Sequence, residues 1–153
     1  MWHYQGEPVE SLEQLSTRLH YKHPENIIGF CYKITNLKTG AIYIGKKSVR
    51  SIRKQKLTRK EQSSDKRRKN YKIVASESDW RTYYGSSKQL VEDVQLLGKD
   101  AFHREILEFA CTKKYLGYLE LKYQFKFDVL VKQSYNGNIL GRYFHRDLEC
   151  MCS

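Results

Sequence analysis

The pattern of hydrophobic and polar positions along the 153 residues predicts an alternation of helices and strands. Val9, Leu12, Leu15 and Leu19 recur at the spacing of one helical face, so we predict a helical N-terminal extension within residues 1–27. The full predicted order is helix, hairpin, basic segment, helix, strand and helix. This order indicates an α+β fold around a small three-stranded sheet.

Two short β-type runs lie close together and predict the hairpin. IIGFCYKIT and AIYIG are rich in β-branched and aromatic residues, and NLKTG between them carries turn residues. If Thr35 pairs with Gly40, Tyr32 lies directly opposite Tyr43 on the same face of the sheet. The two phenols are then either cross-strand packing partners or parts of a site, and the hairpin alone leaves both interpretations open.

Two later helices are predicted on either side of a third strand. Ser86 or Ser87 caps the first helix, which ends at Gly98, and FHREILEFA is the strand. Thr112 caps the second helix. The predicted inner faces are Leu90, Val94 and Leu97 in the first helix and Leu116, Leu119, Tyr123 and Phe127 in the second.

The length suits one domain with a hydrophobic core, and neither a repeat nor a linker divides it. We predict a single domain over 1–153, with a core over 28–137 that contains a basic segment over 46–72. Residues 138–153 form a predicted tail.

The net charge of +11 comes from one place. The segment 46–72 has thirteen Lys or Arg against two acids, and the rest of the chain has fifteen residues of each sign. A solvated loop is the ordinary interpretation of a charge run, but solubility does not require so local an excess. Cations that neutralise phosphates release counterions, so we predict a nucleic acid as the partner. A membrane surface is disfavoured, because apolar anchors do not alternate with these cations.

Within the basic segment we predict a helix over 47–57 and a loop over 62–70. The predicted contacts with nucleic acid are Lys46, Lys47, Arg50, Arg53, Lys54, Lys56, Arg59, Lys60, Lys66, Arg67, Arg68 and Lys69.

No apolar run approaches the length of a membrane span, and the N-terminus lacks the pattern of a secretory signal. Cys31, Cys111, Cys150 and Cys152 are predicted to be reduced thiols of a cytoplasmic protein. His145 lies near the last two, where either a metal site or a loose tail is conceivable. The spacing is not that of a zinc site.

Glu120 is a carboxylate on an otherwise apolar helix, between Leu119 and Leu121. No Lys or Arg stands three or four positions away, so an ion-pair partner must come from another element. One interpretation is a boundary glutamate paired with a cation. The other is a ligand for Mg²⁺, which takes few protein ligands and keeps several waters.

The hairpin resembles the defining motif of the GIY-YIG nucleases. FCY stands at 30–32 and an intact YIG at 43–45, so the two tyrosines are eleven positions apart. SSKQL, LGKDAFHREILE, the helix with Glu120 and SYN at 134–136 follow in the family's order, so the resemblance covers 28–137. The run ESDWRTYYGSSKQL is most similar to the phage-encoded, free-standing homing-type branch.

The resemblance implies a three-stranded antiparallel sheet flanked by helices and a metal-dependent hydrolysis of phosphodiester bonds in DNA. Tyr32 and Tyr43 match the active-site phenols, one of them a general base or a proton relay. A phenol has a reference pKa of about 10. We expect the nearby cations to lower it.

Further roles follow from matched positions. Arg53 matches the arginine that steadies the phosphate oxygens, with Arg50 as runner-up, although one more cation in a basic run is the plain interpretation. Glu120 matches the ligand of Mg²⁺, for which Mn²⁺ substitutes, and Asn136 matches the asparagine that orders the site.

The chain departs from the family in two places. GIY is replaced by FCY, which keeps the tyrosine. Several relatives place a histidine soon after the arginine and another where Gly85 stands, and this chain has neither. Lys46, Lys47 or Tyr84 are the candidate substitutes, and the sequence does not choose between them.

Three functions remain in competition. The first is an endonuclease that nicks duplex DNA as a monomer or as a DNA-induced dimer, with site preference from the basic segment or a partner. The second is a non-catalytic DNA- or RNA-binding protein derived from such a nuclease, and the third is a basic ribosome- or RNA-associated protein. Trp80, Tyr83 and Tyr84 either stack on bases or pack in the core.

Overall fold

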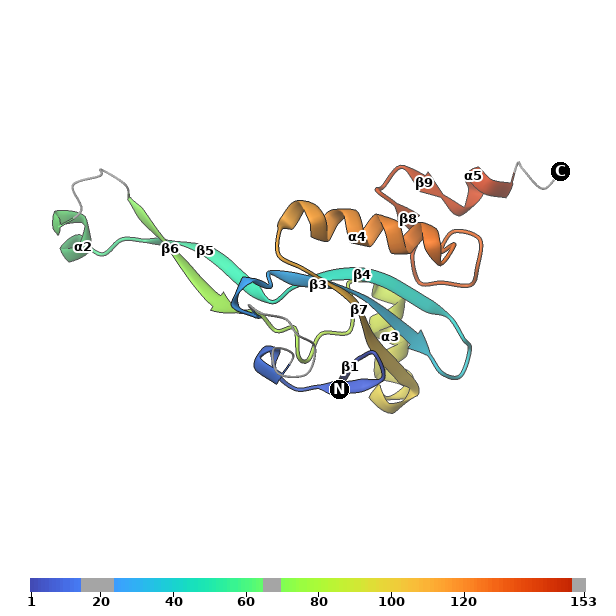
Figure 1. Ribbon diagram of the computed structural model, residues 1–153. Helices are drawn as coiled ribbons and strands as arrows, with labels where there is room; N and C mark the ends of the chain where they lie inside the picture. Colours follow the sequence, from blue (N-terminus) through green and yellow to red (C-terminus); the bar gives the residue numbers. More distant parts are fainter. Residues whose placement is uncertain (15–23, 65–69, 150–153) are drawn as a thin grey trace.

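A computed structural model describes residues 1–14, 24–64 and 70–149 (Figure 1). Helices α3 and α4 lie on opposite faces of one sheet, and a narrow arm projects from this body. The elements are β1 (Trp2–Tyr4), β2 (Glu7–Val9), η1 (Pro24–Asn26), β3 (Gly29–Asn36), β4 (Ile42–Ser48), β5 (Arg50–Lys56), α2 (Arg59–Ser64), β6 (Tyr71–Glu77), α3 (Lys88–Leu97), η2 (Lys99–Ala101), β7 (Phe102–Ala110), α4 (Lys113–Lys126), β8 (Asn138–Ile139), β9 (Tyr143–Phe144) and α5 (His145–Glu149).

The main sheet has five strands in the order β2-β1-β7-β3-β4. Strand β3 is antiparallel to both β4 and β7, whereas β1 is parallel to β7. The α+β class is confirmed, but the prediction of a three-stranded sheet is wrong. The two further strands come from the N-terminus and extend the sheet beyond β7.

The helix predicted from Val9 onward is wrong at its start. Val9 pairs with Trp2 in the β1–β2 hairpin. Gln5 and Gly6 connect the two strands with φ angles of 50° and 85°, and two consecutive positive φ values suit the twist of a hairpin. Helical backbone begins only at Leu12. The last two leucines of the predicted face lie outside the described residues.

The β3–β4 hairpin carries both tyrosines of the motif. Tyr32 pairs with Gly45 and Tyr43 pairs with Ile34, so the predicted register is wrong by two residues. Side chains alternate with a period of two, so both phenols still share one face, and their ring centroids are 6.1 Å apart. The Asn36 side chain accepts hydrogen bonds from the backbone N–H groups two and three residues further on, at 2.9 and 3.3 Å, and this stabilises the turn.

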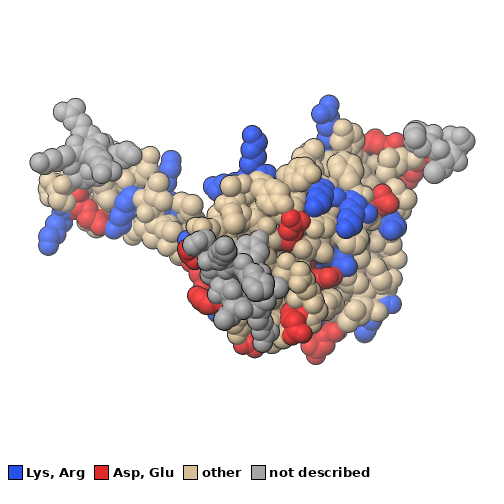
Figure 2. Space-filling view, viewed as in Figure 1, with Lys and Arg blue, Asp and Glu red and all other residues tan. Residues whose placement is uncertain are grey.

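Most of the described part of the basic segment lies on the arm, residues 50–64 and 70–77, whose strands β5 and β6 pair along their whole length (Figure 1). The helix predicted over 47–57 is wrong, and the predicted loop contains the second half of α2. A helix would place Arg50, Arg53 and Lys54 one turn apart, where like charges repel. Strand β6 instead supplies a partner rich in β-branched and aromatic residues. Figure 2 shows Lys and Arg side chains standing out from the arm.

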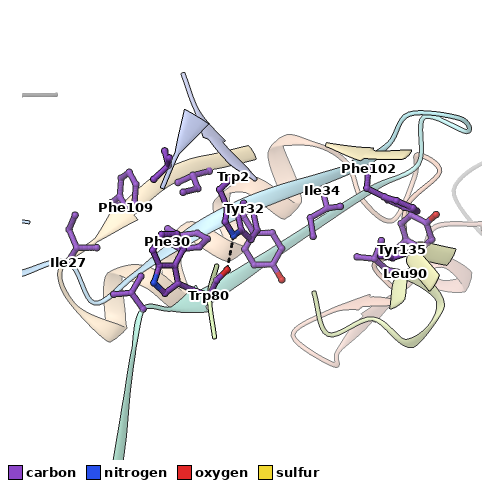
Figure 3. Close-up of a cluster of buried hydrophobic side chains, with 14 of the residues drawn as sticks. Trp2, Ile27, Phe30, Tyr32, Ile34, Trp80, Leu90, Phe102, Phe109 and Tyr135 are labelled. Atoms are coloured by element: carbon purple, nitrogen blue, oxygen red, sulfur yellow. Dashed lines mark hydrogen bonds between the residues drawn. The ribbon is translucent and has the colours of Figure 1, made fainter. Parts of the chain in front are cut away.

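The core lies on both faces of the sheet. On the face that α3 covers, the packed residues include Trp2, Phe30, Tyr32, Ile34, Trp80 and Leu90 (Figure 3). On the face that α4 covers, they include Cys31, Ile44, Leu116 and Leu119. The caps at Ser87 and Thr112 are confirmed, since their hydroxyls accept from the N–H groups three residues later.

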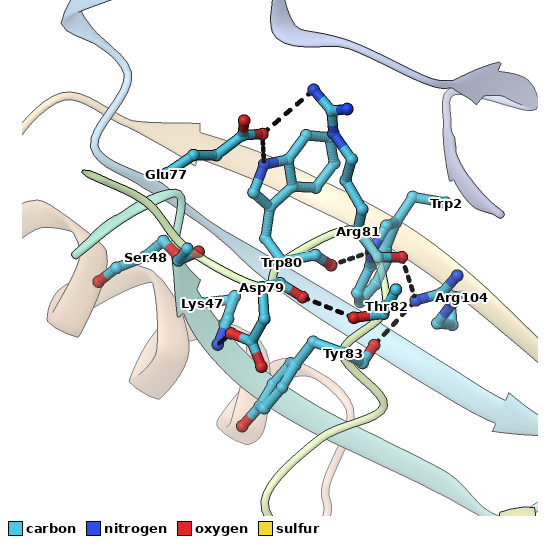
Figure 4. Close-up of polar contacts among 11 residues, drawn as sticks. Trp2, Lys47, Ser48, Glu77, Asp79, Trp80, Arg81, Thr82, Tyr83 and Arg104 are labelled. Carbon is cyan, nitrogen blue, oxygen red and sulfur yellow. Dashed lines mark hydrogen bonds and ion pairs between the residues drawn. The ribbon is translucent and has the colours of Figure 1, made fainter.

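The loop after β6 fastens the base of the arm to the body (Figure 4). The buried Trp80 indole donates to Glu77 Oε1 at 2.8 Å, and the Trp2 indole donates to the Trp80 carbonyl at 2.7 Å. Arg104 donates to two further carbonyl oxygens of this loop, at 3.0 and 2.9 Å. Trp80 is therefore a core residue and does not stack on bases.

Candidate active site

An open groove of about 610 Å³ runs along the outer edge of β4. Strand β4 contributes Tyr43 and Lys46, and Glu120 comes from α4. The start of α3 and the loop over 135–141 complete the lining. Neighbouring side chains of a strand alternate between its faces. At this outer strand, Tyr43 from the α3 side and Lys46 from the α4 side both reach the same groove.

Glu120 sits at the boundary between the core and the groove. Helix α4 buries the preceding residue, Leu119, completely. Lys46 Nζ lies 2.8 Å from Glu120 Oε2, and the Glu120 side chain is 25% exposed. The expectation of an ion-pair partner from another element is confirmed.

Asn136 holds the outer edge of β4. Its side-chain amide pairs with the backbone of Ile44, accepting from the N–H at 2.9 Å and donating to the carbonyl at 2.8 Å. The Tyr135 N–H donates to the carbonyl of Ile42 at 2.8 Å. Backbone groups that an outer strand would leave unpaired are satisfied in this way. Asn136 therefore fixes the part of β4 between Tyr43 and Gly45.

The two tyrosines of the motif have different places. Tyr43 lines the groove, and its hydroxyl is 2.8 Å from Ser86 Oγ. Tyr32 is 1% exposed and lies behind it. A Cβ atom on Gly45 would stand 2.6 Å from Tyr32 Oη and 2.9 Å from the Tyr43 ring. The glycine of YIG thus makes room for both phenols.

Gly85 stands where several relatives place a histidine. Its φ of 90° is unfavourable for other residues, and a Cβ there would lie 2.9 Å from Leu90 and 3.1 Å from the Tyr43 ring. A side chain does not fit at this position unless Leu90 moves and the Tyr43 ring gives way slightly.

Burial raises the pKa of Tyr43 and raises that of Tyr32 well above its ordinary value. The hydrogen bond with Ser86 opposes this shift at Tyr43. The expectation that the basic segment lowers the phenol pKa values is therefore wrong, because most of those cations stand on the solvated arm. Both phenols are protonated at neutral pH.

Arg53 and Arg50 do not line the groove. They line a second hollow at the base of the arm, together with Lys47 and Asp79. Lys47 Nζ is 2.6 Å from Asp79 Oδ1 and 3.9 Å from the centroid of the Tyr83 ring. Lys47 therefore anchors the loop over 78–83 through these two contacts.

The structure brings only some of the predicted site residues together. Tyr43, Lys46, Glu120 and Asn136 meet in the groove, Tyr32 lies behind it, and Arg53 and Arg50 lie outside it. Among the candidate substitutes for histidine, Lys46 lines the groove, whereas Tyr84 packs beneath Arg104 at 4.1 Å.

Of the predicted DNA contacts, Lys46 and Lys47 lie on β4. The arm carries Arg50, Arg53, Lys54, Lys56, Arg59 and Lys60. Lys66, Arg67, Arg68 and Lys69 lie outside the described residues.

His145 holds the C-terminal segment against the groove. Its ring nitrogens lie 2.7 Å from the Leu130 carbonyl and 3.0 Å from the Asn136 carbonyl. Cys150 and Cys152, the partners of the conceivable metal site, lie outside the described residues. Burial raises the pKa of the Cys31 thiol to about 12, which keeps it protonated.

Sequence reasoning missed Ser86 and Tyr135 as parts of the site. Tyr135 donates to Asp93 at 2.7 Å and accepts from Asn36 at 2.9 Å, so it links the groove loop to α3 and to the hairpin turn. SYN contains Tyr135, and GSS contains Ser86. The only sequence signal for either residue was its position beside the residues of a motif.

A sheet between two helices, with a carboxylate, a lysine and a phenol meeting in an edge groove, is compatible with a small nuclease-type domain. The family model described as "Putative endonuclease segE, GIY-YIG domain" matches residues 2–144. The chain therefore belongs to this family of GIY-YIG endonucleases. In the same comparisons, no curated protein and no solved structure matches the chain. Among the described helices, none combines the length and apolar character that a membrane crossing needs.

Proposed function

We propose that the protein is a metal-dependent DNA endonuclease that hydrolyses phosphodiester bonds in the groove along β4. The meeting of Glu120, Lys46 and Tyr43 in one open groove carries this proposal. A carboxylate that can hold a metal, a cation and a hydroxyl group suit a phosphate and its attacking water. Membership in a family of endonucleases supports the same reaction class.

Glu120 is the residue that we propose to hold Mg²⁺, with Mn²⁺ as a substitute. The described residues include no group of three His, Cys, Asp or Glu side chains that can bind a metal together. One carboxylate fits a hard cation that otherwise keeps water and phosphate oxygens, and it does not fit a zinc site. Such an ion, when bound, stabilises the charge on the phosphate and on the leaving 3′-oxygen.

The other groove residues receive roles that follow from their contacts. Lys46 neutralises a phosphate oxygen beside Glu120. The protonated Tyr43 orients the attacking water and relays a proton, with Ser86 fixing its hydroxyl. Asn136 is a positioning residue that acts through β4. We assign Arg53 and Arg50 to phosphates that flank the scissile one, because they lie at the base of the arm.

We propose that one molecule nicks one strand of duplex DNA, since Glu120, Lys46 and Tyr43 meet in one groove of the described residues. A double-strand cut then needs a DNA-induced dimer or a second event. The setting we propose is a phage or another mobile element, with the protein acting in the host cytoplasm on preferred sites.

The test is incubation of supercoiled plasmid and phage genomic DNA with the purified protein, in Mg²⁺ and in excess chelator. We expect open-circular plasmid to appear in Mg²⁺ and not in chelator. Linear product from the first turnover would contradict nicking by a monomer, and cleavage that persists in chelator would contradict metal dependence.

A second candidate is a non-catalytic DNA- or RNA-binding protein. The Lys46–Glu120 ion pair favours it, because the lysine already occupies an oxygen of the carboxylate. This candidate predicts salt-sensitive binding of nucleic acid that is unchanged by Glu120→Ala, with no cleavage in Mg²⁺ or Mn²⁺.

A further inference from the structure

The arm carries exposed apolar side chains on one face. Residues directly opposite each other in a ribbon share a face, and Lys54 lies opposite Ile73. The Lys54 ammonium is 4.8 Å from the Tyr71 ring centroid, as expected for neighbours on that face. The face consists of Ile52, Lys54, Lys56, Tyr71, Ile73 and Ala75, and we call it the reading face.

The reading face is not covered by another layer of the described structure. Ile52 is 61% exposed, Ile73 is 67% exposed and Tyr71 is 38% exposed. The opposite face, with Arg53, Gln55 and Val74, is exposed as well. A two-stranded ribbon alone is marginally stable in water. Apolar side chains on a solvated ribbon therefore indicate a surface that another molecule covers.

The base of the arm is fastened to the body beside β4. Val49, the single residue between β4 and β5, is buried, and its N–H donates to the Ile28 carbonyl at 2.9 Å. The Ser78 N–H donates to the Val49 carbonyl at 2.9 Å, which secures the other strand. The strand that carries Tyr43 and Lys46 thus continues almost directly into the ribbon.

We propose that the ribbon enters the major groove of duplex DNA and that its reading face contacts the base edges. The identity of the partner as DNA rests on the proposed function. A major groove about 12 Å wide admits a two-stranded ribbon, whereas a minor groove about 6 Å wide does not. Ile52 and Ile73 contact thymine methyl groups, and Lys54 reaches the acceptors of guanine.

Charge selects DNA over a second copy of the chain as the occupant. The described residues of the arm include seven Lys or Arg against two Glu. Two such arms repel each other, whereas phosphates on both sides of a groove attract the cations at the edges and tip of the ribbon.

The geometry also sets where the contacted bases lie. Each strand of the ribbon has seven residues. At about 3.3 Å per residue this is about 23 Å, or about seven base pairs at 3.4 Å each. Since the ribbon leaves the body at one end of β4, the contacted bases lie to one side of the cut.

The test compares Ile73→Ser with Val74→Ser, a neighbouring β-branched residue on the opposite face. The proteins are bound to a randomised duplex library in chelator, so that no cleavage is needed, and the bound duplexes are sequenced. We expect the wild type and Val74→Ser to enrich the same block of base pairs. We expect Ile73→Ser to lose about tenfold of that enrichment while its affinity for random DNA stays within about twofold.

Protection from dimethyl sulfate gives a second readout on the selected duplex. Protected guanine N7 atoms, which lie in the major groove, are the expected result. The proposal is overturned if only adenine N3 atoms in the minor groove are protected, if no base pair is enriched, or if both variants behave alike. It is also overturned if Ile73→Ser dissociates a dimer in sedimentation, since a second copy then covers the reading face.

The binding experiment and the cleavage experiment distinguish a failure of the ribbon proposal from a failure of the proposed nuclease function. Selective binding without any cleavage supports the ribbon and contradicts the nuclease. Cleavage with an unchanged base preference in Ile73→Ser supports the nuclease and overturns the ribbon.

Discussion

Gly45 shows why the YIG motif ends in glycine. A methyl group at this position would meet the Tyr32 hydroxyl, and either the phenol or β4 would have to move. Tyr32 is packed beneath other aromatic rings and has little freedom to move. The requirement for glycine thus comes from the close approach of the two tyrosines.

We expect Gly45→Ala to destabilise the protein by about 1–3 kcal/mol, because overpacking forces a shift of the core. Urea unfolding measures the change. Gly117→Ala in α4 is the control, since a Cβ there meets no atom within 4 Å. Alanine favours a helix, so the control should be neutral or more stable by up to about 1 kcal/mol. Equal stabilities of the two variants would contradict the crowding at Gly45.

The two phenols should differ in their contribution to activity. We expect Tyr43→Phe to lower the single-turnover rate of DNA cleavage by about a hundredfold or more, since it removes the hydroxyl group in the groove. Tyr32→Phe should change that rate by less than about tenfold, because its hydroxyl lies behind the groove. The reverse order would show that the reaction uses the buried phenol.

At the scale of residues, the motif named side chains that the structure brings together in part, but it did not predict which of them line the groove. Tyr43, Glu120 and Asn136 were found from spacing and order. That Tyr43 lines the groove while Tyr32 is buried depends on the strand register, which is set by the turn at Asn36. There the Asn36 N–H donates to the Ala41 carbonyl at 2.8 Å, so the turn closes one residue later on each strand than the predicted pair of Thr35 and Gly40.

Among the elements, the arm departs most from expectation. We predicted a helix over 47–57, and no feature within that stretch indicates the strand with which it pairs. The pairing strand begins at Tyr71, fifteen residues after β5 ends. A local pattern does not contain such a long-range contact, so the ribbon was not predictable from its first strand alone.

The far end of the ribbon is held by an ion pair whose stability depends on pH. Lys72 contacts the Glu61 carboxylate of α2, and this contact with the Thr58 hydrogen bonds lowers the Glu61 pKa from 4.5 to about 2. A lowered carboxylate pKa stabilises the folded arrangement above pH 4.5, and the contribution is lost as pH falls toward 2.

We therefore expect α2 to melt before the body during acid titration. Amide chemical shifts of α2 followed by NMR between pH 5 and 2 measure this. The transition should weaken in high salt, since the pair is solvated. Glu61→Gln should remove the pH dependence. An unchanged titration in that variant would contradict the assignment to Glu61.

For the whole molecule, the N-terminal strands are part of the sheet. Trp2 is 1% exposed and packs edge-on against Phe30 and Tyr32 at 5.2 Å. Its indole also bonds to the loop at the base of the arm. The N-terminus thus supports the same aromatic layer that positions Tyr43.

We expect Trp2→Ala to lower the free energy of unfolding by about 3–5 kcal/mol, as for a large aromatic side chain lost from a core. Trp2→Phe keeps much of the packing, so it should lower the free energy of unfolding by less. Most of that smaller loss should come from the missing hydrogen bond to the Trp80 carbonyl. Thermal unfolding followed by circular dichroism compares the two. A Trp2→Ala variant as stable as the wild type would mean that β1 does not contribute to the core.

The overall class was predictable, because helix caps, strand runs and the ordered motifs agree with one another over 28–137. The size of the sheet was not. Residues 1–9 are short, half polar and interrupted by Pro8, and they become strands only because β7 offers an edge and the core accepts Trp2 and Val9.

We propose that Glu120 makes the groove along β4 a nuclease site. The most direct measurement compares the single-turnover cleavage rates of wild type, Glu120→Gln and Glu108→Gln in Mg²⁺, at saturating DNA. Glu108 is a matched control, since it also pairs with a lysine and its side chain is 31% exposed against 25% for Glu120.

We expect Glu120→Gln to lower the rate by at least about a hundredfold and Glu108→Gln to change it by less than about threefold, with DNA affinity retained in both. Equal rates for Glu120→Gln and wild type would contradict the site, and equal losses in the two variants would show that the effect is structural.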